Sequence, residues 1–524
     1  MTTTGIASAE DLDGVDPKVY HRRWAILATM CLSLVLIVAT VSSVNVAIPS
    51  LSGSALRPSD TQVLWIVDAY GLVFAALLLP AGALGDRFGR KGALLIGLTV
   101  FAAASAVCAF MTSANALIAC RAVMGIGAAL IMPSTLSLLQ SCFPRRERTK
   151  AIATWAGFAG AGGAIGPILG GVLLAHYWYG SVFFVAVPIA LVAFFATLVL
   201  APSSREPDAK RLDIGGSLLS IIGFGSLLVA IIEGPERGWS DALVVSGFVA
   251  AVVCLVGFVV YERHVSDALL DMKFFRNRRF AMGSMGISVS FFAMFSMFFI
   301  LTQYLQYVAG YSALGAGLRG LPFAATTIFV SPRAPRISKW LGAKRAVAGG
   351  MFVTAVGVFM LSLVGRDTSY WYVAVCLVVA AAGFGAAMPS LTSGIVQSVP
   401  MHKAGVGAAV NDTTREVGGA VGIAIVGSIV NSIFRSNVVP ALSGMSAAQQ
   451  EFARDNIAKA LSVGDQLAAS GNAAGASELR AAVQQAFLDG AHVGLKVASA
   501  LVLCASVIMY IRLPDSGEHS APSH

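Results

Sequence analysis

The sequence predicts an all-α polytopic membrane protein with fourteen transmembrane helices. Of its 524 residues, 56% are hydrophobic and 12% are charged, and the mean hydropathy is +0.77. This composition excludes a soluble globular enzyme. Apolar stretches long enough to cross roughly 30 Å of hydrocarbon occur at 24–48, 62–84, 93–112, 115–140, 151–175, 180–201, 214–233, 243–261, 280–303, 313–332, 346–365, 372–397, 406–433 and 491–511.

The basic residues indicate how these stretches cross the membrane. In a soluble chain a net charge of +9 would suggest nucleic-acid binding, but here the basic residues lie between apolar stretches. Of the 36 Lys and Arg residues, 25 lie before the first stretch, in alternate loops, or after the last. Because short cytoplasmic loops are enriched in Lys and Arg, we expect both termini in the cytoplasm. The polar residues 1–23 are expected to be a cytoplasmic tail rather than a signal peptide.

An internal repeat predicts the domain organisation. Met132-Pro133-Ser134 recurs 256 residues later as Met388-Pro389-Ser390, and 162–166 (GGAIG) recurs at the same offset as 418–422 (GGAVG). A weaker echo links 89–91 with 342–344. Repeated halves that rock around a midplane site are a transporter design. We therefore expect a tail at 1–23, a six-helix half at 24–201, a two-helix insert with its cytoplasmic loops at 202–279, a second half at 280–511 with an external loop at 434–490, and a tail at 512–524.

Two glycine-rich motifs are candidate gating elements. The first is a basic turn between the second and third stretches, and the second is a GxxxG segment followed by proline in the fifth stretch. Glycine lets backbones approach closely, and proline interrupts the helical hydrogen-bond ladder. The candidate gating residues are Gly82, Gly85, Asp86, Arg87, Gly89, Arg90, Gly162, Gly166, Pro167, Gly170 and Gly171.

Charged residues inside apolar stretches are candidates for coupling or substrate binding, because burying charge in a membrane is costly. Asp68 lies between Trp65 and Tyr70, whose rings could add cation–π surface if they face inward. Arg121 needs a buried carboxylate or carbonyl partner, so it is either a coupling residue or a structural arginine held by backbone carbonyls.

The thirteenth stretch carries the densest polar cluster, Asn411-Asp412-Thr413-Thr414-Arg415-Glu416. On a helix, Asp412, Arg415 and Glu416 share one face and can form a local ion pair. The matching positions of the first half are apolar, which favours a coupling site over symmetric scaffolding. A self-neutralising structural cluster is the alternative.

These motifs together resemble those of the major facilitator superfamily, and in particular its fourteen-helix drug:proton antiporters that export quaternary ammonium and lipophilic cations. The resemblance rests on 65–70 (WIVDAY), on the 82–91 loop, on the motifs of the fourth and fifth stretches, on 234–239 (GPERGW) and on Gln303-Tyr304-Leu305-Gln306. It implies proton coupling through Arg121 and export through the fifth-stretch motif, and it adds Asn45, Trp65, Tyr70, Gln303 and Tyr304 as cavity candidates.

Two departures from the family pattern concern charge. The aspartate of the family's first-span motif is Thr40 here, and the acidic residue that some dication exporters carry in span ten is absent near Thr326 and Thr327. Both departures place dicationic substrates in doubt.

The sequence therefore predicts a proton-coupled multidrug efflux antiporter, not an enzyme, that exports monocationic or neutral lipophilic compounds by alternating access. Its expected partners are drugs or dyes, protons and the lipid bilayer, without nucleic acid. We expect a monomer in the bacterial inner membrane, driven by the proton gradient, with no cofactor and no metal site. A dedicated exporter of one metabolite, lipid or antibiotic, and a non-transporting membrane sensor, remain alternatives.

Overall fold

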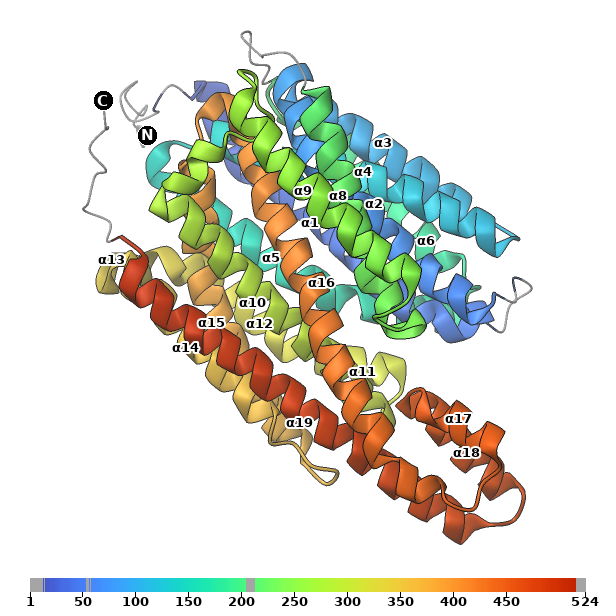
Figure 1. Ribbon diagram of the computed structural model, residues 1–524. Helices are drawn as coiled ribbons and strands as arrows, with labels where there is room; N and C mark the ends of the chain where they lie inside the picture. Colours follow the sequence, from blue (N-terminus) through green and yellow to red (C-terminus); the bar gives the residue numbers. More distant parts are fainter. Residues whose placement is uncertain (1–12, 14, 53–55, 57, 204–212, 515–524) are drawn as a thin grey trace, which may run out of the picture.

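The computed structural model describes residues 13, 15–52, 56, 58–203 and 213–514, and within them it is a bundle of long helices (Figure 1). Residues 1–12 and 14 of the expected tail 1–23, residues 515–524 of the expected tail 512–524, and residues 204–212 lie outside the described residues. The first half contains α1 (Pro17–Ser52), α2 (Asp60–Phe88), α3 (Arg90–Ala109), α4 (Ala114–Cys142), α5 (Arg145–His176), α6 (Ser181–Phe184) and α7 (Ala186–Leu200). Then come α8 (Ile214–Arg237), α9 (Ala242–His264) and the 3₁₀ turn η2 (Met272–Arg276).

The second half contains α10 (Arg278–Gln303), the π-helical turn η3 (Tyr304–Val308), α11 (Ala313–Arg319), α12 (Leu321–Val330), η4 (Ser331–Arg333), α13 (Ala334–Leu341), α14 (Ala343–Leu361), α15 (Tyr370–Gln397), η5 (Met401–Lys403), α16 (Ala404–Asn437), η6 (Val439–Leu442), α17 (Ala447–Arg454), α18 (Ile457–Ala469) and α19 (Ala473–Arg512). Thirteen helices within the described residues are long and apolar enough to span a membrane. The remaining expected span is α5, a 32-residue helix of the same bundle whose 165–176 segment is apolar.

The sequence repeat corresponds to a repeated packing arrangement. In the first half α5 packs on α1, and Gly162 and Gly166 lie against Val38 and Ala39. In the second half α16 packs on α10, and Gly418 and Gly422 lie against Ser288 and Phe292. The glycines of both repeats therefore allow two backbones to touch where a side chain would separate them.

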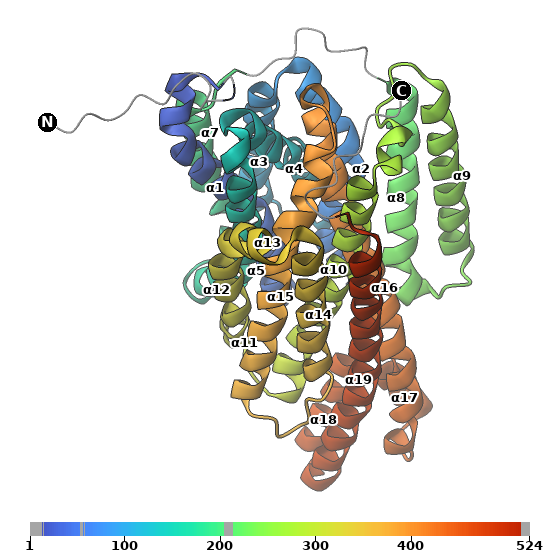
Figure 2. The ribbon, with the colours of Figure 1, turned by 90° about the vertical axis from the view of Figure 1, so that its left-hand side faces the viewer.

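The two-helix insert lies at the edge of the bundle (Figure 2). Helix α8 packs on α2 and also touches α16, whereas the main helix partner of α9 is α8. Much of α9 is exposed, including Val249, Val252 and Val253. The insert therefore adds an outer wall with an exposed apolar face beside α2.

Two expected segments differ in detail from the structure. The expected span 313–332 is instead a broken helix that continues as α13 to Leu341. Pro322, Pro332 and Pro335 lie at the starts of its segments, where the missing N–H of proline is tolerated. The expected external loop 434–490 instead contains α17 and α18, with Asn456 capping α18. Its last residues join the last span in one 40-residue helix, α19.

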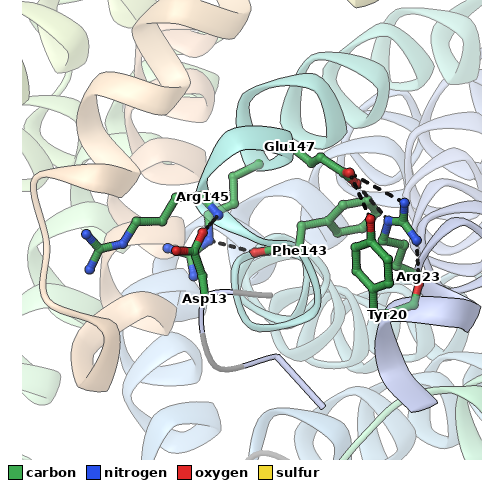
Figure 3. Close-up of polar contacts among 7 residues, drawn as sticks. Asp13, Tyr20, Arg23, Phe143, Arg145 and Glu147 are labelled. Carbon is green, nitrogen blue, oxygen red and sulfur yellow. Dashed lines mark hydrogen bonds and ion pairs between the residues drawn. The ribbon is translucent and has the colours of Figure 1, made fainter. Parts of the chain in front are cut away.

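We refer to the end of the bundle where α1 begins, α2 ends and α19 ends as the basic end; α17 and α18 project from the opposite end (Figure 1). At the basic end Glu147, in the first turn of α5, accepts hydrogen bonds from Arg23 Nε at 2.7 Å and from the Tyr20 hydroxyl at 3.4 Å (Figure 3). The Asp13 carboxylate accepts the Arg145 backbone N–H at 2.7 Å. These contacts join the starts of α1 and α5 within the first half.

The close packing of α5 on α1 yields a matched pair of substitutions. A side chain at Gly166 would overlap the Ala39 carbonyl and the Ser42 hydroxyl, whereas one at Gly163 would meet no atom within 4 Å. We expect Gly166→Val to destabilise the purified protein by about 1–3 kcal/mol through overpacking. Gly163→Val should leave its thermal unfolding unchanged, and equal melting temperatures for the two variants would contradict this packing account.

Candidate transport site and gates

A buried carboxylate joins the two halves at the basic end. Asp86, near the end of α2, accepts hydrogen bonds from the backbone N–H groups of Gly405 at 2.9 Å and Val406 at 3.1 Å. Both amides belong to the first turn of α16, where helical N–H groups lack intrahelical partners and the helix dipole favours negative charge. Asp86 therefore caps a helix of the opposite half.

Arg90 completes this contact. The Arg90 guanidinium lies 3.0 Å from the Asp86 carboxylate and donates a second hydrogen bond to the Met401 carbonyl. We call the group formed by Asp86, Arg90, Gly405 and Val406 the Asp86 lock. Both charged side chains of the lock are buried, so each needs the other to offset its desolvation.

The expected turn between the second and third spans is shorter than the motif, because Gly82 and Gly85 lie in the last turns of α2 and only Gly89 separates α2 from α3. These three glycines have different roles around the lock. A side chain at Gly82 would lie 2.5 Å from the Gly405 carbonyl, so glycine is required for α2 to approach α16. Gly89 has φ +104°, in the region that favours glycine, and separates α2 from α3. Gly85 meets no such constraint, since its nearest neighbour is the Ser134 hydroxyl at 3.5 Å. Arg87 lies over the exposed ring of Phe88.

The fifth-span motif contacts both halves. Gly166 and Gly170 face α1, where their neighbours are Ala39 and Ser43. Pro167 and Gly171 instead meet α11 of the second half, where their neighbours are Gly317 and Leu314. A helix that packs this closely on both sides is placed to act as a pivot.

Arg121 of α4 is completely buried and bonds to α2. Its Nε and Nη2 atoms donate to the Ile66 and Val67 carbonyls at 2.9 and 3.1 Å. Its guanidinium lies 4.7 Å from the centre of the Tyr70 ring. The backbone-held arrangement considered for a structural arginine is thus present, yet the Nη1 atom has no hydrogen-bond partner among the described atoms. Asp68 is close enough to interact with Arg121 electrostatically.

Most of the polar cluster of α16 is buried, and only Thr414 and Glu416 are partly exposed. Asp412 is 0% exposed and accepts a hydrogen bond from Asn411 Nδ2 at 3.0 Å. Arg415 Nη1 lies 3.5 Å from the same carboxylate oxygen, Oδ1, and its guanidinium lies 4.6 Å from the Phe291 ring centre. The other oxygen, Asp412 Oδ2, is buried without a hydrogen-bond partner among the described atoms.

The clusters of the two halves approach each other at the contact of α2, α4 and α16. Helix α16 packs on both α2 and α4, and Tyr70 interacts electrostatically with both Arg121 and Glu416. A charged group of each half therefore lies within electrostatic range of one buried tyrosine. A change in charge in one half alters the electrostatic potential at this tyrosine, because charges interact strongly where water is largely excluded.

A functional candidate that sequence reasoning missed is Glu233 of α8. It is 3% exposed, accepts a hydrogen bond from Trp65 Nε1 at 3.0 Å, and pairs with Arg237 one turn later. Trp65 is therefore bonded to the insert. Glu233 was not selected from the sequence because it lies at the end of an apolar stretch, where a charged residue is common. Its spacing of four residues from Arg237 did indicate an ion pair on one helix face.

Of the remaining cavity candidates, Gln303 and Tyr304 form their hydrogen bonds within the second half. The side chain of Asn45 is outside the described part of the chain. Gln303 bonds to the Phe299 carbonyl of its own helix. Tyr304 is buried inside the second half, where its hydroxyl donates to the Gly365 carbonyl at 3.1 Å. Among the described residues, no group of three or more His, Cys, Asp or Glu side chains could hold a metal ion.

Comparison with known proteins agrees with this architecture. The profile of the Major Facilitator Superfamily matches residues 30–423. The chain belongs to this superfamily, and it is therefore a multi-pass membrane transporter rather than an enzyme. It is 36% identical to the multidrug efflux pump LfrA of Mycolicibacterium smegmatis, over 93% of this chain and 96% of the relative. It is 32% identical to the methyl viologen resistance protein SmvA of Salmonella typhimurium, over 94% and 98%.

Solved structures support the fold alone. The proton:xylose symporter XylE aligns with a TM-score of 0.58 at 14% identity, covering 94% of this chain and 96% of that one. The human organic anion transporter MFSD10 aligns with the same TM-score at 13% identity, covering 93% and 99%.

Proposed function

We propose that the chain is a proton-coupled multidrug efflux antiporter of the bacterial inner membrane, with its basic end in the cytoplasm. The observation that carries the proposal is the buried carboxylate of Asp412, which is paired with Arg415 at the contact between the halves. Two relatives that match nearly the whole chain are named for multidrug efflux and for methyl viologen resistance, which supports export of toxic amphipathic compounds. The excess of basic residues at the basic end supports the orientation.

The arrangement suggests how proton binding is coupled to movement of the halves. Asp412 Oδ2 has no hydrogen-bond partner among the residues that the structure describes, so it can accept a proton without breaking any bond seen there. Protonation would remove the attraction between Asp412 and Arg415, and Arg415 would then interact more strongly with Glu416. Because Glu416 and Arg121 both interact with Tyr70, this shift would change the electrostatic balance between the halves. Asp68 would bind the cationic substrate when ionised and release it when protonated.

The two glycine-rich motifs would carry the movement that follows. In this proposal the Asp86 lock is the cytoplasmic gate, and 162–171 is the pivot on which α5 turns against α11. The energy comes from the proton gradient and no cofactor is needed. The protein would act as a monomer, since each half completes the other at this contact.

A second transport function, dedicated export of one metabolite, lipid or antibiotic, is favoured by one comparison. The chain is 33% identical to the methylenomycin A resistance protein of Bacillus subtilis, over 78% of this chain and 87% of that relative. A panel of unrelated dyes separates the two possibilities, because a dedicated exporter would move at most one of them. A non-transporting sensor would move none.

Coupling can be tested by neutralising the buried acids. We expect Asp412→Asn and Asp68→Asn to reduce proton-driven ethidium efflux from cells at least about ten-fold, because the proton-binding group is lost. Asp465→Asn, on the exposed α17–α18 hairpin, is the matched control and should leave efflux unchanged. An uncoupler should abolish efflux by the wild type. Normal efflux by both variants at normal expression would rule out the assigned carboxylates.

The substrate charge range can also be tested. Thr40 and Thr327 are buried, and their hydroxyls bond to the carbonyls of Leu36 and Phe323 in their own helices. These positions therefore supply no negative charge, and a second cation without a partner costs several kcal/mol to desolvate. We expect monovalent ethidium to be exported more efficiently than rigid divalent diamidines. The name of the Salmonella relative makes methyl viologen, a dication, the strictest probe, and its robust export by the wild type would overturn the charge argument.

A further inference from the structure

A cavity of about 540 Å³, lined by several hydroxyl and amide side chains and by one arginine, opens at the basic end beside the end of α19. It is lined by α10, α13, α14 and α15 of the second half and by Thr149 of α5 in the first half. Proton coupling and gating, as proposed above, make no use of it.

The internal repeat shows what this cavity corresponds to. The 256-residue offset relates Thr149 to Gly405 and Ser134 to Ser390, and the loop echo relates Gly85 to Ser338. The structure supports these relations, because Gly85 lies against the Ser134 hydroxyl while Ser338 bonds to the Ser390 hydroxyl at 2.9 Å. Gly342 also has φ +85°, close to the +104° of Gly89. The cavity therefore occupies the position in the second half that the Asp86 lock occupies in the first.

The charged residues of the lock are replaced in the second half. The weaker repeat that links 89–91 with 342–344 relates Asp86 to Lys339 and Arg90 to Ala343. Lys339 is exposed and Ala343 lines the cavity. The second half thus lacks the internal carboxylate that fills the corresponding space in the first half, and it carries a basic residue at the related position.

The lining is suited to an anion. Arg279 is the one charged side chain among the described residues of the lining. Ser393 is 7% exposed, and its hydroxyl lacks a hydrogen-bond partner among the described atoms. The cavity also meets the start of α14 at Ala343, a helix that has no side-chain cap. Arginine, a free hydroxyl and an uncapped helix N-terminus are a combination that binds phosphate groups.

We propose that this cavity binds a phosphate-type anion, which takes the place that the Asp86 carboxylate fills in the first half. The anion is either the headgroup of an acidic phospholipid or a soluble phosphate. It would bind to Arg279 and Ser393 of the second half and lie beside Thr149 of the first half, so it would hold α5 against α15 as Asp86 holds α2 against α16. The site does not depend on the proposed drug efflux.

Binding can be measured on the purified full-length protein in a neutral detergent. The probes are short-chain dioctanoyl phosphatidylglycerol and inorganic phosphate, with dioctanoyl phosphatidylcholine as the uncharged reference. We expect saturable binding of at least one anionic probe. Arg279→Gln should weaken it about ten-fold, as expected for the loss of a charge-assisted hydrogen bond. Ser393→Val should weaken it about three-fold, as expected for a neutral hydrogen bond.

The matched control is Arg278→Gln, at the neighbouring exposed arginine, which does not line the cavity and should bind like the wild type. Saturation by phosphate would identify a soluble anion, and saturation by the lipid alone would identify a headgroup. Both outcomes support the site. The proposal is overturned if the wild type binds neither anionic probe, or if Arg279→Gln and Ser393→Val, eluting as monodisperse protein, bind as tightly as the wild type.

Discussion

The contact between the Asp86 carboxylate and the first turn of α16 is the interaction on which the rest of the arrangement depends. It is the place where a buried charge of one half satisfies backbone N–H groups of the other. Both helices then run on to the buried cluster. Asp412 follows Gly405 by seven residues, or about 10 Å of helix, and Tyr70 lies about 24 Å from Asp86 along α2. Movement at the lock therefore reaches the charged cluster through two continuous helices.

The two halves of the protein share their packing but differ in where their buried charges lie. The repeated glycines give α5 and α16 equivalent packing on α1 and α10, but the charges are distributed unequally. The first half supplies the Asp86 lock, and α16 of the second half supplies the buried Asp412–Arg415 pair. Each of these carboxylates is paired with an arginine of its own half, Asp86 with Arg90 and Asp412 with Arg415. What the second half adds to the first is the pair of backbone N–H groups that hydrogen-bond to Asp86, a contact that can break without leaving either charge unpaired. Such a contact is expected of a transporter that has two stable arrangements of rigid halves.

Much of the fold was predictable from the sequence because membrane spans and the repeat leave strong signals. Asp412 and Arg415 were predicted to form an ion pair from their spacing on one helix face, and they do. Interactions between distant segments were not predictable. Trp65 was expected to offer its ring to a cavity, yet its indole bonds to Glu233, 168 residues away. The partners of Arg121 were likewise left open, because backbone carbonyls carry no sequence signal. The breaks between α11, α12 and α13 follow from prolines that the hydropathy pattern averages out.

The most direct test of this account is the distance between α2 and α16 at the basic end. Spin labels at Phe88 and Met401, both exposed, would report it by pulsed electron resonance in a background without other reactive cysteines. Asp86→Ala should shift the equilibrium toward the longer distance by about ten-fold, because hydrogen bonds to a charged group are lost. Arg87→Gln, in the same last turn of α2, should leave the distances unchanged. Identical distance distributions for the wild type and Asp86→Ala would show that this carboxylate does not hold the halves together.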